Sequence, residues 1–116
     1  MVKDNLIREK TFSFALDVVR LYRELQARHE YVLSKQLLRS GTSIGANMEE
    51  ACAGQSRADF RAKMSIASKE ARESKYWLRL LQESKIVEID LTEQLAKADE
   101  ITRILTAIVK TSGESR

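Results

Sequence analysis

No proline occurs in the 116 residues of the chain, and glycine occurs only four times. A chain of this length with average usage would carry roughly six prolines and eight glycines. Residues that build tight turns are therefore scarce, whereas a β-sandwich or barrel needs a turn about every 8 to 12 residues. This scarcity predicts a few long helices around one hydrophobic core.

The strongest helical pattern lies between Ser56 and Ser84. Apolar and small residues recur there at alternating spacings of four and three, namely Phe60, Met64, Ala67, Ala71, Ser74, Leu78 and Leu81. Such a heptad-like stripe predicts a helix that packs nearly parallel or antiparallel to its neighbours. Ser56 and Asp59 form a capping box at its start, because their side chains can satisfy amides of the first turn.

Three more helices complete the predicted fold. A second capping box, residues 90–93, opens a last helix that is expected to stop at Gly113. A helix over about residues 32–53 should end before Gly54 and direct these residues inward: Leu33, Leu37, Ile44, Met48 and Cys52. With the first helix they predict an all-α, antiparallel up-down-up-down four-helix bundle. We expect a single domain over residues 1–116, with about 1–10 and 112–116 frayed.

The first helix carries apolar residues on two adjacent stripes, at positions 12, 15, 19 and 22 and at 14, 18, 21 and 25. Asn5 and Thr11 are alternative caps for its start. A helix apolar over so much of its circumference is usually covered on two sides, and a four-helix monomer supplies one interior. We therefore hypothesise a subunit interface formed by Phe14, Val18, Leu21 and Trp77. Ordinary packing within one chain is the alternative.

Two glycines, Gly41 and Gly45, fall inside the second predicted helix, where each costs about 1 kcal/mol relative to Ala. Either a loop splits this helix, or the glycines let another helix approach closely. Asn47 and Glu50 follow in the same small and apolar stretch. We interpret these two residues as structural, bonding across helices near the glycines or lying at a subunit contact, rather than as a buried acidic site.

Three segments together resemble a known bacterial family. They are residues 33–51 (LSKQLLRSGTSIGANMEEA), residues 56–60 (SRADF) and residues 71–78 (ARESKYWL). Over about residues 10–109, the chain is similar to the four helix bundle proteins named after the intervening sequences of 23S ribosomal RNA genes. Some members are mislabelled as ribosomal proteins. The resemblance supports the predicted bundle and implies that its second helix continues through Gly41 and Gly45.

The same resemblance implies a ring-shaped homopentamer. It supplies no catalytic residues, because most members have no known biochemical activity. In a related branch, the accessory protein of diversity-generating retroelements, a basic ring binds a reverse transcriptase and nucleic acid. Nucleic acid or a reverse-transcriptase-like protein is therefore the partner that the resemblance suggests.

Positive charge concentrates on the third predicted helix. From Arg57 to Arg79 there are seven Lys and Arg against three acids, whereas residues 80–116 carry five against seven. One line beside the apolar stripe contains cations and serines but no acid: Arg57, Arg61, Ser65, Ser68, Arg72, Lys75 and Arg79. Its five cations are candidate phosphate contacts for a nucleic acid. The alternative is a solvated flank whose cations pair with acids of a neighbouring helix or subunit.

Several classes of protein are excluded or disfavoured. One Cys and one His cannot form an intrachain disulfide or a structural zinc site, and the Glu-x-x-His pairs of di-iron bundles are missing. Neither a phosphate-binding loop nor a Ser/His/Asp set is present. The most apolar stretch, residues 104–109, is too short to span a membrane, and no signal peptide is evident. We therefore expect a cytoplasmic protein without metal or cofactor.

Two functions agree with these observations. The first is a non-enzymatic homo-oligomeric helical scaffold that acts as an adaptor for nucleic acid or for a nucleic-acid enzyme, through the basic line of the third helix. The second is a protein–protein interaction scaffold without a nucleic-acid role, whose cations form salt bridges between subunits.

Overall fold

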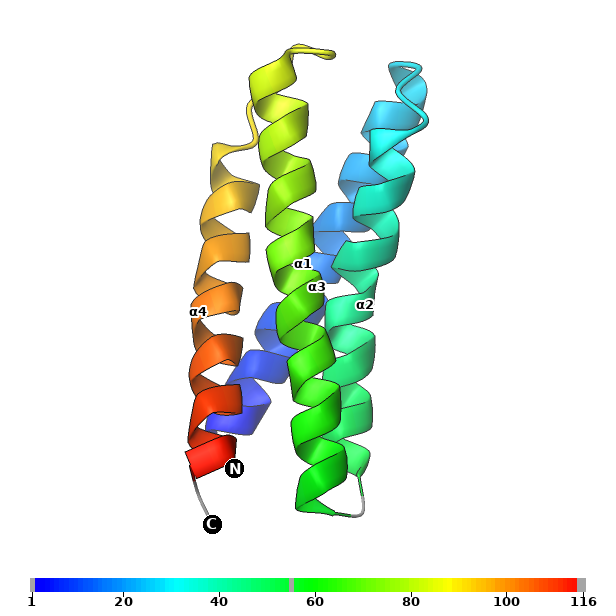
Figure 1. Cartoon of the computed structure of the whole chain (residues 1–116). Coiled ribbons are helices and arrows are strands. Elements are labelled where there is room, and N and C mark those ends of the chain that lie inside the picture. Colours follow the sequence, from blue (N-terminus) through cyan, green and yellow to red (C-terminus); the bar gives the residue numbers. More distant parts are fainter. Residues whose placement is uncertain (1, 55, 115–116) are drawn as a thin grey trace.

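The structure of the chain is a computed structural model that describes residues 2–54 and 56–114 (Figure 1). Over those residues it contains no strand and four helices: α1 (Val2–Ala27), α2 (Leu33–Ala53), α3 (Arg57–Ser84) and α4 (Thr92–Glu114). Consecutive helices run in opposite directions, so the two chain ends lie at the same end of the molecule (Figure 1). The predicted all-α four-helix bundle is confirmed.

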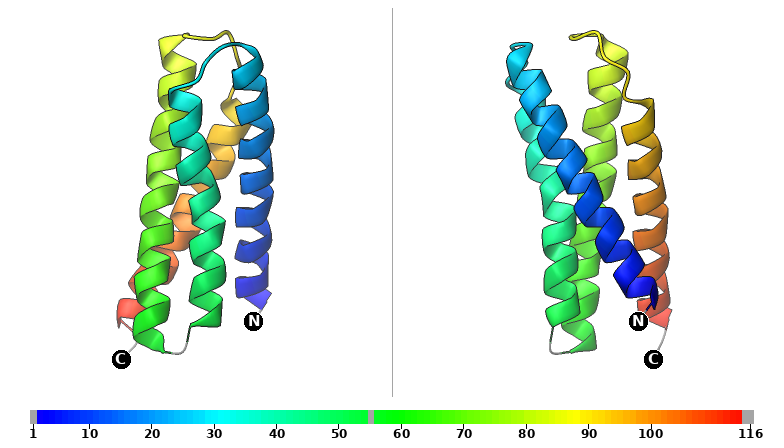
Figure 2. Two further views of the ribbon diagram at one scale, coloured as in Figure 1. Left: turned by 90° about the vertical axis from the view of Figure 1, so that its right-hand side faces the viewer. Right: turned by 180° about the vertical axis from the view of Figure 1, so that it is seen from behind.

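The bundle is elongated, with principal extents of 48 × 22 × 21 Å. α2 packs most extensively on α3, and α3 in turn packs on α4. α1 crosses the back of the bundle obliquely, with its C-terminal end beside α2 and its N-terminal end beside α4 (Figure 2). Because of this inclination, α1 and α4 make the fewest contacts of the neighbouring pairs.

The helices begin where the sequence predicts for α2, α3 and α4. The Ser56 hydroxyl accepts a hydrogen bond from the Asp59 amide at 3.1 Å, as expected of an N-cap. At α4, Asp90 Oδ1 accepts from the Thr92 amide at 3.0 Å. The heptad stripe of α3 forms the centre of the core, with these residues buried: Met64, Ala67, Ala71, Ser74, Leu78 and Leu81.

Three local predictions are wrong. α1 already includes Val2, and Thr11 is no cap, because it lies fully buried within the helix with its hydroxyl donating to the Arg8 carbonyl. Cys52 is exposed, because the buried stripe of α2 continues from Met48 to Ala51. α4 passes through Gly113, which has no positive φ and therefore does not terminate the helix.

The expectation of frayed ends concerns residues 1–10 and 112–116. The described parts of these segments, residues 2–10 and 112–114, are helical. The remaining positions, 1 and 115–116, lie outside the described residues.

α2 continues through both of its glycines without an intervening loop. A Cβ atom on Gly41 would lie 2.8 and 2.9 Å from the two γ carbons of Val18 on α1, and real Cβ atoms do not approach so closely. A Cβ atom on Gly45 would lie 3.5 Å or more from Thr11, which is ordinary contact. The close approach of α1 and α2 therefore requires glycine at position 41 and not at position 45.

We expect Gly41→Ala and Gly45→Ala to change stability in opposite directions. Gly45→Ala should raise the free energy of unfolding by about 0.5–1 kcal/mol, because Ala favours the helix more than Gly does. Gly41→Ala should lower it by about 1 kcal/mol, because overpacking a core costs about 1–3 kcal/mol and outweighs the same helical gain. Urea denaturation followed by circular dichroism measures both.

Val18→Ala provides the control for this pair, because it removes the two γ carbons that a Cβ at position 41 would meet. In that background, Gly41→Ala should lose most of its destabilising effect, because only the Cβ of residue 18, 3.2 Å away, still meets the added Cβ. An equal effect of Gly41→Ala in both backgrounds would contradict the steric explanation.

Candidate nucleic-acid interface on α3 and α4

α3 and α4 run antiparallel and side by side (Figure 1). Three contacts fix their register, between these residues: Lys75 and Asp99, Ser68 and Thr106, Arg61 and Gly113. Seven residues toward the N-terminus of α3 therefore correspond to seven residues toward the C-terminus of α4. The basic line predicted on α3 consequently lies along the seam between the two helices.

In the half of this seam nearest the α3–α4 connection, the cations are matched by acids. Lys75 Nζ lies 2.7 Å from Asp99 Oδ1, and Arg103 pairs with the same carboxylate. The hydrogen bond from Lys75, with the positive charge of Arg103 nearby, holds the pKa of Asp99 below its ordinary value. Arg79 Nε lies 3.3 Å from Glu83 Oε2. For Lys75, the structure thus shows the pairing with an acid of a neighbouring helix that was the alternative interpretation. Arg79 instead pairs with an acid of its own helix.

The other half of the seam, near the chain ends, differs in charge. Arg57, Arg61 and Arg72 are exposed there. Among the described residues, no carboxylate forms an ion pair with Arg61 or Arg72. Arg72 Nη1 instead donates to the Ser68 hydroxyl at 2.9 Å. This half therefore presents two guanidinium groups, those of Arg61 and Arg72, whose charge no carboxylate of the described residues neutralises.

Three shallow hollows follow this half of the seam. One of about 350 Å³ is lined by Arg57, Ala58, Arg61, Ser112 and Gly113. A second of about 260 Å³ is lined by Ser65, Ser68, Arg72, Thr106, Val109 and Lys110. A third of about 270 Å³ is lined by Arg57, Phe60, Thr111 and Ser112. No Asp or Glu is among these described lining residues, and cations and hydroxyl groups predominate.

We name this surface the basic seam and define it by Arg57, Arg61, Ser65, Ser68 and Arg72 of α3 with Thr106, Lys110 and Ser112 of α4. Sequence reasoning found its α3 half and missed its α4 half. A signal was present, because residues 101–113 contain two cations and five hydroxyl or glycine positions but no acid. This stretch belongs to the site because the register of α4 against α3 places it opposite the basic line.

The interface hypothesis for α1 is wrong for three of its four residues. Phe14, Val18 and Leu21 are 0%, 1% and 4% exposed within a single chain, so no second subunit can reach them. In the other stripe of α1, Phe12 is 64% and Val19 41% exposed, whereas Ala15 and Tyr22 are half-buried. Leu16, at 40%, extends that exposed stripe. The core lies on the 14, 18, 21, 25 side because α2 and α4 flank α1 there.

Trp77 is half-buried and packs against the core of its own chain. Its indole Nε1 donates to Glu73 Oε2 at 3.0 Å, and Glu73 also pairs with Arg39 of α2. Tyr76, stacked edge-on against Trp77, is 57% exposed. Trp77 therefore belongs to a polar network between α2 and α3 of its own chain. This agrees with the alternative, ordinary packing within one chain.

Comparison with known proteins gives a family for this fold. The family model described as "23S rRNA-intervening sequence protein" matches residues 3–107. The chain belongs to the 23S rRNA-intervening sequence protein family. No curated protein matches it.

A solved structure agrees with this family membership. The crystal structure of a protein with unknown function from the S23 ribosomal protein family of Bacteroides thetaiotaomicron is 47% identical in sequence, with a TM-score of 0.88. The similarity covers 94% of this 23S rRNA-intervening sequence protein and 99% of that chain. The two therefore share the bundle over nearly their whole length.

The remaining predicted residues of this 23S rRNA-intervening sequence protein lie on α2. Asn47 Nδ2 donates to the carbonyl and hydroxyl oxygens of Ser43, at 2.9 and 3.2 Å, so these hydrogen bonds stay within α2 rather than crossing to another helix. Glu50 is exposed. Beside it, Glu49 accepts a hydrogen bond from Arg8 of α1, which lowers the pKa of the Glu49 carboxyl.

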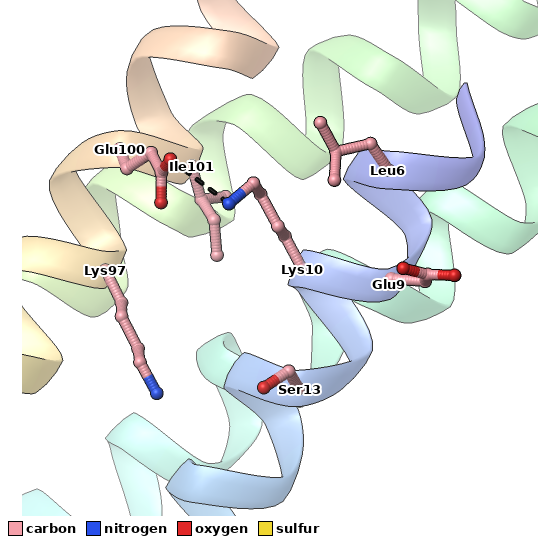
Figure 3. A pocket seen from close by; sticks show the side chains of 7 residues that line it. All are labelled: Leu6, Glu9, Lys10, Ser13, Lys97, Glu100 and Ile101. Atoms are coloured by element: carbon pink, nitrogen blue, oxygen red, sulfur yellow. Dashed lines mark ion pairs between the residues drawn. The ribbon is translucent and has the colours of Figure 1, made fainter. Parts of the chain in front are cut away.

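A further hollow of about 310 Å³ lies between α1 and α4 in this family member (Figure 3). Its lining residues are Leu6, Glu9, Lys10, Ser13, Lys97, Glu100 and Ile101. Both lysines are matched, since Lys10 lies 3.2 Å from Glu100 and Lys97 lies 2.6 Å from Asp17. Within the described residues, no group of three His, Cys, Asp or Glu could hold a metal ion. None of the described helices is long and apolar enough to cross a bilayer.

Proposed function

We propose that this protein is a non-catalytic, homo-oligomeric adaptor that binds the phosphate backbone of a nucleic acid along α3. The observation that carries the proposal is the contrast along one helix. Lys75 and Arg79 are matched by acids of the chain, whereas Arg61 and Arg72 are exposed with no carboxylate of the described residues beside them. Exposed, unneutralised guanidinium groups in a row are suited to phosphate contacts.

Assembly into a ring, as the family resemblance implies for a homopentamer, would repeat this surface on every subunit. Repetition raises the local positive potential and the avidity for a polyanion. The exposed stripe of α1, formed by Phe12, Leu16 and Val19, is the surface we assign to the contact between subunits. Large apolar side chains gathered on one exposed helix face are typical of such contacts.

That apolar stripe also favours the second candidate function, a protein–protein scaffold without a nucleic-acid role. In that case the stripe would bind another protein, and the cations of α3 would serve solubility and ion pairing. The two candidates differ in one measurable property, the affinity of the purified protein for nucleic acid.

Fluorescence anisotropy with labelled RNA or DNA about 20 nucleotides long, in about 50 mM salt, tests the proposal. The protein should bind, and the double variant Arg61→Glu/Arg72→Glu should bind at least about tenfold more weakly, because two phosphate contacts are reversed. Lys75→Glu/Arg79→Glu is the matched control, since it changes the net charge of the same helix by the same amount. Its effect should be smaller.

Two results would contradict this function. Absence of binding by the unaltered protein would leave the protein–protein scaffold as the better account. Equal weakening by the two double variants would show that binding follows net charge alone and not the row of unneutralised cations.

A further inference from the structure

We infer that the basic seam is a two-helix site for a phosphodiester backbone, in which α4 supplies Lys110 and hydroxyl groups and no base is read. This inference rests on the proposed function and deepens it. It adds α4 residues to the site, and Lys110 and Ser112 lie beyond the residues 3–107 that the family model matches.

Lys110 brings a positive charge to the α4 side of the seam. Lys110 is exposed and lines the same hollow as Arg72 of α3. Among the described residues no carboxylate forms an ion pair with Lys110. Lys97 on the same helix differs, because Asp17 lies 2.6 Å from its Nζ. The unneutralised cation of α4 is therefore the one that faces the unneutralised cations of α3.

A row of hydroxyl groups lies between these cations. Ser65, Ser68 and Thr106 line one hollow with Arg72 and Lys110. The Ser68 and Thr106 hydroxyls lie 3.5 Å apart across the seam, and Ser68 also accepts from Arg72. Hydroxyl and guanidinium donors are the groups that proteins use to position phosphates. Both helices therefore present donors toward one shared hollow.

The basic seam has a limit at each end. Asp99 marks one end, because its carboxylate pairs with both Lys75 and Arg103 and occupies the donors of these cations. At the other end Arg61 packs on α4, where a Cβ at Gly113 would lie 3.0 Å from its Nη2. The negative end of the α4 dipole favours a cation there. From Arg57 to Arg72 the seam runs about 22 Å along α3, or roughly six nucleotide repeats of one strand.

The chemistry of the seam indicates contact with the backbone and not with the bases. Phe60 is the aromatic residue among the described lining residues, and it is half-buried against the core. Base stacking needs exposed aromatic faces, and base reading needs donors that enter a groove. We therefore expect affinities that are equal, within about threefold, for strands of equal length and different sequence.

Lys110→Gln and Thr106→Val test the α4 half in the same anisotropy assay, with the full-length protein and labelled RNA and DNA strands. Lys110→Gln should weaken binding by about three- to tenfold and reduce the slope of log affinity against log salt by about one. Thr106→Val should weaken it by about two- to fivefold, through one lost hydrogen bond. Lys97→Gln, which removes a matched cation from the same helix, should change binding less than twofold. All three positions are at the surface or half-buried, and circular dichroism verifies that the helices are retained.

The outcomes separate this inference from the function on which it rests. Binding by the unaltered protein with no weakening by Lys110→Gln or Thr106→Val would overturn the two-helix site and leave the proposed function standing. A more than tenfold preference for one base sequence would overturn the backbone-only part. A preference between RNA and DNA of equal sequence identifies which backbone the hydroxyl groups fit. Loss of that preference in Thr106→Val supports the site. No binding by the unaltered protein overturns both proposals.

Discussion

Phe14→Asp is expected to leave the chain unfolded at room temperature. The Phe14 ring is fully buried in the core of a single chain. Truncating such a ring to Ala costs about 3–5 kcal/mol, and a buried unpaired carboxylate adds to that loss. The sum approaches the entire free energy of unfolding of a small domain, about 5–15 kcal/mol. Circular dichroism and size-exclusion chromatography should show loss of helix and aggregation or expansion.

Phe12→Asp is the matched control, because the same residue type stands two positions away on the same helix but is 64% exposed. It should change the free energy of unfolding of a subunit by no more than about 0.5 kcal/mol, as surface substitutions usually do. If the exposed stripe is the contact between subunits, Phe12→Asp should also reduce the mass of the assembly, measured by light scattering. A folded Phe14→Asp variant with a reduced mass would restore the interface hypothesis for Phe14, Val18 and Leu21.

Glu30→Ala is expected to lower the free energy of unfolding by about 2–3 kcal/mol. Val32, the residue at the N-cap of α2, has no side chain that can accept a hydrogen bond. The Glu30 carboxylate takes that role, accepting from the amides of Val32, Leu33 and Ser34 at 3.2, 3.0 and 2.7 Å. Glu30 is only 6% exposed, and its removal leaves these amides of the first turn without their partner, of which the Ser34 amide is buried.

Glu24→Ala serves as the control for this prediction. Glu24 is an exposed acid on α1 that pairs with Arg28 four residues later. Such surface pairs contribute about 0.3–0.5 kcal/mol, so urea denaturation should give a midpoint close to that of the unaltered protein. Equal destabilisation by Glu24→Ala and Glu30→Ala would contradict the capping role of Glu30.

Much of the fold could be predicted because one periodic signal covers each helix. The stripe from Met64 to Leu81 placed α3 and its buried face correctly, and Ser56 marked its start. The wrong interface prediction concerns α1, because its sequence fits two different assignments of the buried face. α1 has two apolar stripes of similar strength, and periodicity does not tell which of them meets the other three helices. The oblique path of α1 decides the question, and Gly41 leaves the room that Val18 needs where α1 approaches α2.

The candidate site was less predictable, because it depends on what lies opposite each side chain. The sequence ranks Arg61, Arg72, Lys75 and Arg79 as equivalent members of one line. The structure separates them by bringing Asp99 of α4 to Lys75 and leaving Arg61 beside Gly113. A cap such as Glu30 was missed for a related reason. Glu30 precedes the helix by three residues and its side chain reaches forward to the amides of the first turn, which no capping-box pattern describes.

The central claim is that the unneutralised cations of the basic seam hold phosphate groups, and the salt dependence of nucleic-acid binding tests it most directly. The slope of log affinity against log salt reports how many phosphates the protein neutralises. For the triple variant Arg61→Gln/Arg72→Gln/Lys110→Gln, this slope should be smaller in magnitude by about two to three than for the unaltered protein. An unchanged slope in the triple variant would contradict the claim.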